Sequence, residues 1–385
     1  MNVEDVIAAA RAQSGLSEIG DPDILEGLRR LLKAYAEEAK FTARGAQMAH
    51  ADVINNLVIR MKVEDWLTKH PELLDRPIEK PMFVFGLPRT GTTLLINLLH
   101  SDPARRSFLR WEAFDPVPPP KKEELSAGPR YEAMQARTMG MLKLAPHIAA
   151  IHYEDADSPT ECQFAMTPSF CAQVYEAQAD IPSWRHWLLH EADYLPAFRF
   201  EKRFLQLLQA DAPGRWTLKN PWHPLFLDAL TTIFPDAQLV MTHRDPAEVV
   251  GSCCSLIKFV RQMFSNDVDL KSIGTSFIDT FSIMIERALA FKAKHGWDSI
   301  YDVQYADVMR DPIGEVRKIY AHFGEPLTEQ AEAAMRGYLA ANPQGKHGNH
   351  VYALEEYGLS EDSVRAHFKD YIARFNIPVS GRNPV

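Results

Sequence analysis

The chain has 385 residues, of which 46% are hydrophobic and 24% charged, and its formal net charge at pH 7 is −9. This length suits one large α/β domain with elaborations or two modest domains, and the composition is globular rather than disordered or fibrous. The acidic balance argues against a general nucleic-acid or anionic-membrane surface, so we expect no nucleic-acid partner and expect any phosphate to be held by local groups.

The start of the chain, MNVEDVIAAARAQSG, has acidic residues and no basic leader before an apolar run. We therefore expect neither a signal nor a transit peptide. No stretch reaches the ~18 uninterrupted apolar residues that span a bilayer, so no membrane span is predicted. The cysteines, at positions 162, 171, 253 and 254, lack metal-ligand spacing. The sequence predicts reduced cysteines, a cytoplasmic location and no metal site.

Residues 2 to about 70 carry helical periodicity with few strand signals. They predict an N-terminal helical segment, residues 1–75, ahead of an α/β domain at residues 76–385. The N-terminal helices are also a candidate pairing surface for a homodimer.

Short apolar runs with β propensity alternate with helical patterns through the rest of the chain. An apolar strand begins at about residue 81, and further runs are RWTLK at 215, AQLVMTH at 237 and SIYDVQY at 299. Strands that alternate with helices predict a parallel sheet with crossover helices, that is, an α/β fold. A long insertion, residues 105–210, is rich in aromatic residues and predicts either a helical lid over an apolar pocket or a plain helical core.

The segment PMFVFGLPRTGTTLLINLLHSD, residues 81–102, predicts a strand, a tight turn and an amphipathic helix. Gly86 and Gly91 have the spacing of the P-loop G-x-x-x-x-G-K-[ST], but Thr92 stands where that motif has its lysine. Backbone N–H groups at the start of the helix would converge on an anion, and Arg89 adds a permanent charge. These residues predict a phosphate site that needs no metal.

Several separated motifs, in order, resemble those of the sulfotransferase family, whose members use 3′-phosphoadenosine 5′-phosphosulfate (PAPS) as sulfuryl donor. LPRTGTT is similar to the family's 5′-phosphosulfate loop, P-[KR]-[ST]-G-T-T, which the resemblance places on Arg89, Thr90, Gly91, Thr92 and Thr93. THRDPAEVVGSCCS resembles the 3′-phosphate motif, an arginine followed eight residues later by a serine, here Arg244 and Ser252. An arginine at a strand end and a serine two turns into the next helix can both face a phosphate at the carboxyl edge of a sheet.

Two weaker matches extend the resemblance to roughly residues 80–375. In YDVQYADVMRDP, Tyr305 takes a position that the resemblance places near the adenosine of the donor. In GKHGNHVY, a triplet is similar to the family's late basic-glycine loop over the 3′-phosphate; it consists of Lys346, His347 and Gly348. Leu94 replaces a tryptophan that follows GTT in the cytosolic small-molecule branch. The sequence looks more like the bacterial and protein-tyrosine branches, and the resemblance implies a three-layer, P-loop-like fold.

Sulfuryl transfer needs a base for the acceptor proton and donors that stabilise the leaving phosphate oxygen. Lys219, at the end of the second predicted strand, is the candidate for the leaving group. For the base, Glu112 stands one element after the loop helix, where the protein-tyrosine branch carries a glutamate. Glu161 is a second candidate, although residues 158–161 also read as a helix capping box. His223 is the third, by its intrinsic pKa.

The sequence therefore predicts metal-free transfer of a sulfuryl group from PAPS to a hydroxyl of an organic acceptor. The aromatic insertion indicates a partly apolar pocket that fits a small phenol, a sterol-like alcohol, a lipid or a glycan attached to an apolar group. Two alternatives stay open. The spacing of Gly86 and Gly91 is also compatible with a P-loop kinase or nucleotide-binding regulator, and a catalytically silent nucleotide-binding module would share the same motifs.

Overall fold

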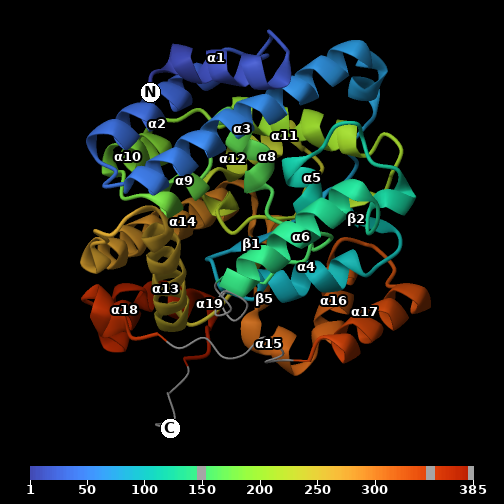
Figure 1. Ribbon diagram of the computed structural model, residues 1–385. Coiled ribbons are helices and arrows are strands. Elements are labelled where there is room, and N and C mark those ends of the chain that lie inside the picture. Colours follow the sequence, from blue (N-terminus) through green and yellow to red (C-terminus); the bar gives the residue numbers. More distant parts are fainter. Residues whose placement is uncertain (145–152, 344–351, 380–385) are drawn as a thin grey trace.

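A five-stranded parallel sheet lies at the centre of the protein, shown in Figure 1 as a computed structural model that describes residues 1–144, 153–343 and 352–379. The strand order is β2-β3-β1-β4-β5. The predicted parallel α/β sheet is confirmed, and its four predicted strands are all present. The strands are β1 (Met82–Gly86), β2 (Arg105–Ser107), β3 (Arg215–Lys219), β4 (Gln238–His243) and β5 (Tyr301–Gln304).

The order of the strands creates a crevice at the carboxyl edge of the sheet. β1 is central: Met82 pairs with Thr217 of β3 on one side and with Gln238 of β4 on the other. The chain crosses to one side of β1 to form β3 and to the other to form β4, so the loops after these strands diverge there. In open parallel sheets, ligands bind at such a switch point.

Alternate residues of the strands supply two separate cores. Phe83 and Phe85 face a large core that also contains residues of the N-terminal helices and of the insertion. Met82 and Val84 face a smaller core on the other side of the sheet. Because successive side chains of a strand point to opposite faces, both faces of the sheet are apolar and both are covered by helices. The predicted three layers are therefore confirmed. The helices on the smaller core are α4 (Thr92–His100), α15 (Tyr305–Arg310), α16 (Pro312–His322) and α17 (Glu329–Ala341).

The N-terminal segment is helical, as predicted, and lies at the top of Figure 1. Its long helix α3 approaches α13 (Pro246–Phe264) so closely that a Cβ on Gly45 would collide with the carbonyl oxygen of Phe264. The division into two domains near residue 75 stays a prediction. The helices of the segment are α1 (Val3–Ser14), α2 (Ile24–Glu37) and α3 (Ala43–Lys69).

The insertion between β1 and β3 is mainly helical, as predicted. The prediction included no strand, and this is wrong at the start of the insertion. Arg105 pairs with Arg215 and Ser107 with Thr217, so β2 forms an edge strand. Its sequence, RRS, has no apolar alternation. Its two arginines are instead held by carboxylates: Arg105 donates to Glu325 and Arg106 donates to Glu112. The helices are α5 (Arg110–Phe114), α6 (Pro129–Leu144), α8 (Gln163–Met166), α9 (Val174–Gln178), α10 (Pro182–His190) and α11 (Leu195–Leu208).

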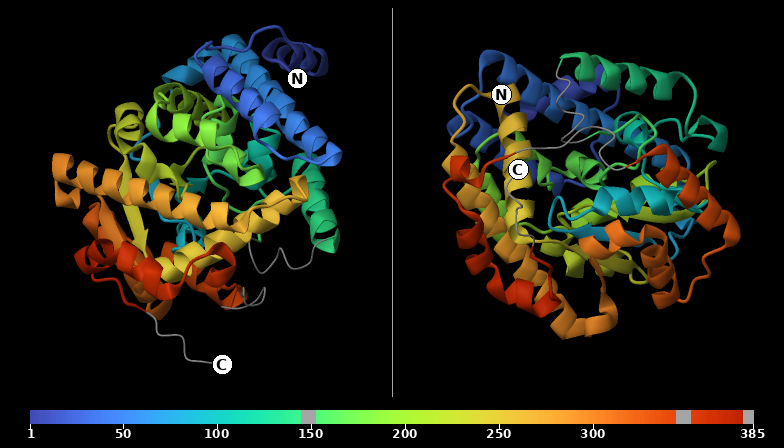
Figure 2. Two further views of the ribbon diagram at one scale, coloured as in Figure 1. Left: turned by 90° about the vertical axis from the view of Figure 1, so that its left-hand side faces the viewer. Right: turned by 90° about the horizontal axis from the view of Figure 1, so that it is seen from below.

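After β3 the chain completes the layers around the sheet. Figure 2 shows the two long helices α13 and α14, in gold and orange, beside one another, with the red C-terminal helices below them. Within the described ranges no helix has the length and apolar character needed to cross a membrane. The remaining helices are α12 (Leu227–Ile233), α14 (Leu270–His295), α18 (Glu361–His367) and α19 (Lys369–Phe375).

Candidate active site

The loop between β1 and α4 has a backbone that only particular residues adopt easily. Gly91, with φ of 91°, caps α4, and a Cβ there would lie 2.7 Å from Cδ2 of Tyr305. Arg89 also has a positive φ, 72°, which is unusual for a residue with a side chain. Such strained residues cluster at functional sites. The first amide groups of α4 have no intrahelical acceptor and lie at the positive end of the helix dipole.

The hydroxyl of Thr90 has a structural task in this loop. The side chain is buried, and its Oγ1 donates to the carbonyl oxygen of Leu87 at 2.6 Å and lies 2.6 Å from Oγ1 of Thr242. These contacts tie the loop to β4. Thr92 and Thr93 instead line the adjacent cavity. Of the three threonines, Thr90 thus shapes the loop while the other two border the cavity.

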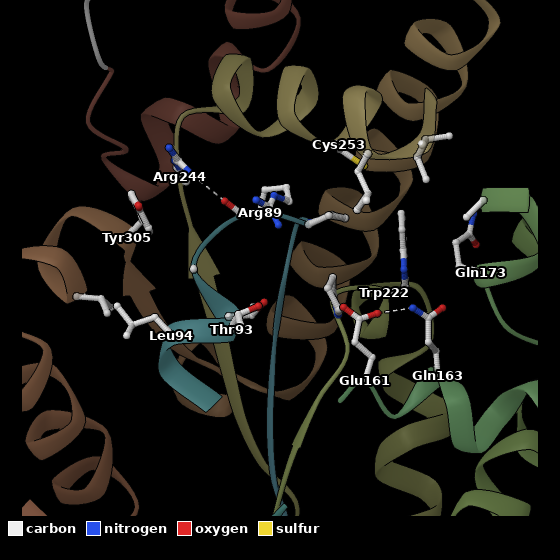
Figure 3. Close-up of a pocket in the computed structure, with 18 of the residues that line it drawn as sticks. Arg89, Thr93, Leu94, Glu161, Gln163, Gln173, Trp222, Arg244, Cys253 and Tyr305 are labelled. Atoms are coloured by element: carbon white, nitrogen blue, oxygen red, sulfur yellow. Dashed lines mark hydrogen bonds between the residues drawn. The ribbon is translucent and has the colours of Figure 1, made fainter. Parts of the chain in front are cut away.

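The two predicted phosphate motifs meet in the fold, although 155 residues separate Arg89 from Arg244. Arg89 Nε donates to Ser252 Oγ at 3.0 Å, and Arg244 Nη1 donates to the Arg89 carbonyl oxygen at 3.1 Å. The Arg244 guanidinium lies over the ring of Tyr305, 4.2 Å from its centroid, and its Nε donates to Glu248 at 2.7 Å. Figure 3 shows Arg244 and Tyr305 at one end of the cavity and Arg89 beside them, toward its middle.

The electrostatics of this end favour an anion. Burial is the main cause that lowers the pKa of Arg89, and the nearby Arg244 guanidinium acts in the same direction. Within the part of the chain that the structure describes, no carboxylate lies in ion-pair range of Arg89. A largely buried cation without a counter-charge is costly, so a bound anion would stabilise this arrangement.

Glu161 and Lys219 form an ion pair on the opposite wall. Lys219, the last residue of β3, is 1% exposed, and its Nζ donates to Glu161 Oε1 at 3.1 Å. The side chain of Gln163 donates to the other carboxylate oxygen of Glu161, as Figure 3 shows. The Glu161 carboxylate is thus held by two neighbours while its residue still lines the cavity.

The capping-box interpretation of residues 158–161 is wrong. α8 begins only at Gln163, and Glu161 forms a parallel bridge with Lys219 instead. The next amide, of Cys162, donates to the Lys219 carbonyl oxygen at 2.8 Å. Backbone pairing with the end of β3 therefore keeps this segment extended where the local sequence favours a helix start.

Arg89, Arg244, Tyr305 and Glu161 line one cavity of about 620 Å³ at the carboxyl edge of the sheet, whereas Lys219 and Ser252 are not among its lining residues. In Figure 3, Arg244, Tyr305, Thr93 and Leu94 lie toward one end and Glu161, Gln163, Trp222 and Gln173 toward the other, with Arg89 between them. The second end is otherwise mainly apolar. The apolar residues that line it are Phe164, Val174, Ala177, Trp222, Leu256, Ile257, Val260 and Phe277.

Residues 81–329 match the Sulfotransferase family. The chain belongs to this family. Sulfotransferase STF9 from Mycobacterium avium is 36% identical, with a TM-score of 0.93 over 99% of this chain and 98% of that one. STF1 from Mycobacterium tuberculosis H37Rv is 35% identical, with a TM-score of 0.86 over 96% and 99%. These similarities confirm the predicted resemblance to bacterial members and make the protein an enzyme of the sulfotransferase class.

One curated relative is named after the acceptor that it sulfates. Omega-hydroxy-beta-dihydromenaquinone-9 sulfotransferase Stf3, from Mycobacterium bovis and Mycobacterium tuberculosis, is 24% identical over 308 residues, or 77% of this chain and 75% of its own length. The present sulfotransferase is therefore similar to a protein named for the sulfation of a hydroxylated menaquinone.

Glu112 lies apart from the cavity of this sulfotransferase. Its side chain is fully buried, accepts from Arg106 Nη1 at 3.3 Å and accepts from the Leu109 amide at 3.1 Å. The Arg106 guanidinium in turn stacks over the Trp216 ring, 4.7 Å from its centroid. Glu112 is not among the residues that line the cavity, and these contacts make it part of the support for β2.

His223 is also outside the lining of the cavity. It is fully buried, its Nε2 lies 3.4 Å from Cys162 Sγ, and its ring packs edge-on against Phe83 and Phe226. Burial lowers the pKa of His223 to about 3, so the imidazole is neutral at physiological pH. Its surroundings are those of a core histidine.

The late basic-glycine triplet lies outside the described residues; its members are Lys346, His347 and Gly348. Tyr352, just after it, is described: its hydroxyl donates to the Glu248 carbonyl oxygen at 3.0 Å, and its ring lies against Gly251. The cavity residues that were not predicted from the sequence include the polar or aromatic residues Gln163, Gln173 and Trp222. No motif marks them, because only the fold brings the insertion and the loop after β3 to this wall.

Proposed function

We propose that this sulfotransferase transfers a sulfuryl group from PAPS to the hydroxyl of an elongated, lipid-like acceptor. The observation that carries the proposal is the arrangement of one cavity with Arg244 at one end, Glu161 at the other, where Lys219 holds it, and Arg89 between them. PAPS supplies an activated sulfuryl group with 3′,5′-adenosine diphosphate as the leaving group. Membership of the family implies this donor.

The residues present fit the donor. The 5′-phosphosulfate belongs at the start of α4, where Arg89 and the first amide groups converge. The 3′-phosphate belongs at Arg244 and Ser252, which supply a guanidinium fork and a hydroxyl. Tyr305 occupies the space that a side chain at position 91 would need, which supports a tightly built adenosine site. Leu94 and its aliphatic neighbours would pack on the base in place of a tryptophan.

Each group of the Glu161–Lys219 pair has a separate task. Glu161 accepts the proton of the acceptor hydroxyl, because its carboxylate is the one that borders the cavity. Lys219 does not itself line the cavity; it holds Glu161 in place and adds positive charge behind it. Arg89, which lines the cavity, provides positive charge for the phosphate oxygen that becomes negative as the sulfuryl group leaves. Positioning and charge stabilisation of this kind are the protein's main contributions in such group transfers.

The apolar end of the cavity supports a lipid-like acceptor. Its lining is mainly aliphatic and aromatic, with Gln163 and Gln173 as polar exceptions. A bare glycan would leave its hydroxyl groups without partners there, at a cost in affinity. The acceptor named for the curated relative Stf3, a hydroxylated menaquinone, has this combination of a hydroxyl and a long apolar chain. The predicted cytoplasmic location and the homodimer remain proposals.

A thermal-shift titration tests the donor and separates it from the kinase alternative. We expect 3′,5′-adenosine diphosphate, the desulfated donor, to raise the Tm more than Mg–ATP does, because only the former carries a 3′-phosphate for Arg244. A ligand at a hundred times its Kd adds about 2.7 kcal/mol to the free energy of unfolding. Greater stabilisation by Mg–ATP would reject the sulfuryl donor in favour of a kinase.

Arginine variants make this test specific for the 3′-phosphate site. Arg244→Ala should weaken binding of 3′,5′-adenosine diphosphate by at least about tenfold, whereas Arg336→Ala should leave it unchanged. Both arginines pair with a glutamate one helical turn away, Arg244 with Glu248 and Arg336 with Glu332. The two variants therefore lose a similar ion pair, and only Arg244 lines the cavity.

A further inference from the structure

A second cavity of about 350 Å³ adjoins the apolar end of the active-site cavity. It lies between α3, α6 and α13, and Ile59, Met141 and Phe259 come from these three helices to line it. None of the residues placed in the donor site or in catalysis lines this second cavity. The reaction proposed above therefore assigns no role to this second cavity.

The two cavities share a wall. Phe164, Val174, Leu256 and Val260 line both of them. Phe164 and Val174 directly follow Gln163 and Gln173, which Figure 3 places at the end of the first cavity where Glu161 lies. The acceptor end rather than the donor end therefore leads into the second cavity. Phe164 follows the proposed base by three residues and also packs against Phe114, with ring centroids 5.6 Å apart.

The first cavity is too small to contain both substrates completely if the acceptor is large. Its volume, about 620 Å³, lies within the roughly 300–1,000 Å³ typical of a site for one small ligand. It must hold the whole donor together with the hydroxyl end of the acceptor. The remainder of a long acceptor needs another space, and the second cavity begins where that remainder would leave the first.

The second cavity suits an apolar chain that reaches toward the protein surface. Phe114 and Met263 line it and are 36% and 40% exposed, although both are large hydrophobic residues. Exposed apolar side chains at a cavity mouth mark a place where an apolar ligand enters or emerges. Some polar residues that line the second cavity are paired with one another: Gln178 Nε2 donates to Asp52 at 3.0 Å, and Arg110 Nη1 donates to Glu154 at 2.8 Å.

We propose that the second cavity binds the tail of the acceptor, so that the two cavities form one continuous acceptor site. This inference rests on the proposed function. It narrows the acceptor to a linear amphiphile: a terminal hydroxyl near Glu161, followed by a long alkyl or isoprenoid chain that passes Phe164 and Val260 into the second cavity. Rigid polycyclic alcohols and short phenols would leave the second cavity empty.

The test compares binding of octanol and hexadecanol, each tritiated and delivered from cyclodextrin complexes, with and without 3′,5′-adenosine diphosphate. Each additional methylene that is buried lowers the Kd up to about fourfold. We expect hexadecanol to bind the native protein at least about tenfold more tightly than octanol. An equal Kd for the two alcohols would overturn the proposal.

Matched tryptophan variants of α6 locate the effect. Met141 lines the second cavity, whereas Met139 on the same helix lines neither cavity and is 43% exposed. Met141→Trp should remove most of the preference for hexadecanol and leave the Kd of octanol unchanged, while Met139→Trp should behave as the native protein. Met263→Trp, at the exposed mouth, provides a second block if Met141→Trp does not fold.

These experiments distinguish a failure of the proposed tail site from a failure of the proposed donor. A chain-length preference that survives Met141→Trp and Met263→Trp would reject the tail site, even where 3′,5′-adenosine diphosphate still stabilises the protein. Absence of nucleotide binding with an intact, Met141-dependent preference would instead reject the donor and keep the tail site.

Discussion

Glu161 and Glu112 each pair with a cation, but their surroundings give them different capacities. Glu161 belongs to a segment that borders the cavity, and its partner Lys219 ends a strand at the carboxyl edge of the sheet. Glu112 is enclosed with Arg106 and holds the amide of Leu109. A proton acceptor must reach the acceptor hydroxyl, and of these two carboxylates only Glu161 has that access.

Glutamine substitutions distinguish these two carboxylates. Glu161→Gln should lower kcat about 10²–10⁴-fold at saturating PAPS, because it removes a general base and keeps the shape of the side chain. It should also lower the Tm, because it leaves the buried Lys219 without its carboxylate partner. Glu112→Gln should keep a normal kcat and lower the free energy of unfolding by about 3–5 kcal/mol, because it leaves Arg106 as an uncompensated buried charge. Steady-state kinetics and urea unfolding of both variants provide the measurements.

If Glu112→Gln lowered kcat and Glu161→Gln did not, the role of base would belong to Glu112. A normal kcat in both variants would point to neither carboxylate. His223 would not replace them easily, since burial lowers its pKa to about 3 and its ring does not line the cavity.

Among the helices, strands and turns, the turn from β1 into α4 is the part of the site that local sequence encodes best. The glycines, Arg89 and the threonines predict a strand, a turn and a helix, and all three are present. Gly91 explains why the turn is so restricted, since its φ of 91° and its contact with Tyr305 both exclude a side chain.

A pair of alanine variants separates these two demands on Gly91. Gly91→Ala should weaken binding of 3′,5′-adenosine diphosphate by at least about tenfold and lower the free energy of unfolding by roughly 1–3 kcal/mol, because it adds backbone strain and displaces Tyr305. Gly128→Ala is the control, because Gly128 has the same φ of 91° but a Cβ added there would meet no heavy atom within 4 Å. Nucleotide binding is measured by calorimetry and stability by urea unfolding.

Gly128→Ala should show only the cost of backbone strain and bind nucleotide normally. Equal losses of nucleotide affinity in the two variants would contradict a specific role for the contact between Gly91 and Tyr305.

Other elements could not be predicted because their partners are distant in sequence. β2 is three residues long and contains two arginines, so neither hydrophobicity nor alternation indicates a strand. Its position depends on pairing with β3, whose first residue, Arg215, is the partner of Arg105. The extended segment at Glu161 likewise depends on the end of β3 and overrides a local capping signal.

A buried acid behind the active site couples the stability of the whole protein to pH. Glu201 lies in α11, is fully buried and stands beside Cys162. Burial raises the pKa of its carboxyl from 4.5 to about 8. Between these two values the folded protein keeps the proton of Glu201 and the unfolded chain has released it. The stabilising contribution is therefore complete below pH 4.5 and is lost as pH rises toward 8.

Glu201→Gln should remove this loss of stability. We expect the native protein to lose up to about 1.4 kcal/mol of unfolding free energy per pH unit from this carboxyl between about pH 5 and 8. The variant should be less sensitive to pH over the same range, because its amide does not ionise. Urea unfolding at about pH 5, 6.5 and 8 measures both proteins, and parallel curves for the two would contradict the assignment.

The amino-acid sequence alone was enough to predict the parallel α/β fold, the helical N-terminus and the sulfotransferase family, and it proposes two phosphate motifs that the fold brings together. These features depend on short-range periodicity and on motifs in which neighbouring residues act together. Packing in three dimensions was needed to learn which carboxylate borders the cavity, where Lys219 finds its partner and where a second cavity adjoins the first. Those answers depend on how the insertion, α3 and α13 pack over the sheet, and no local pattern encodes contacts between segments so far apart.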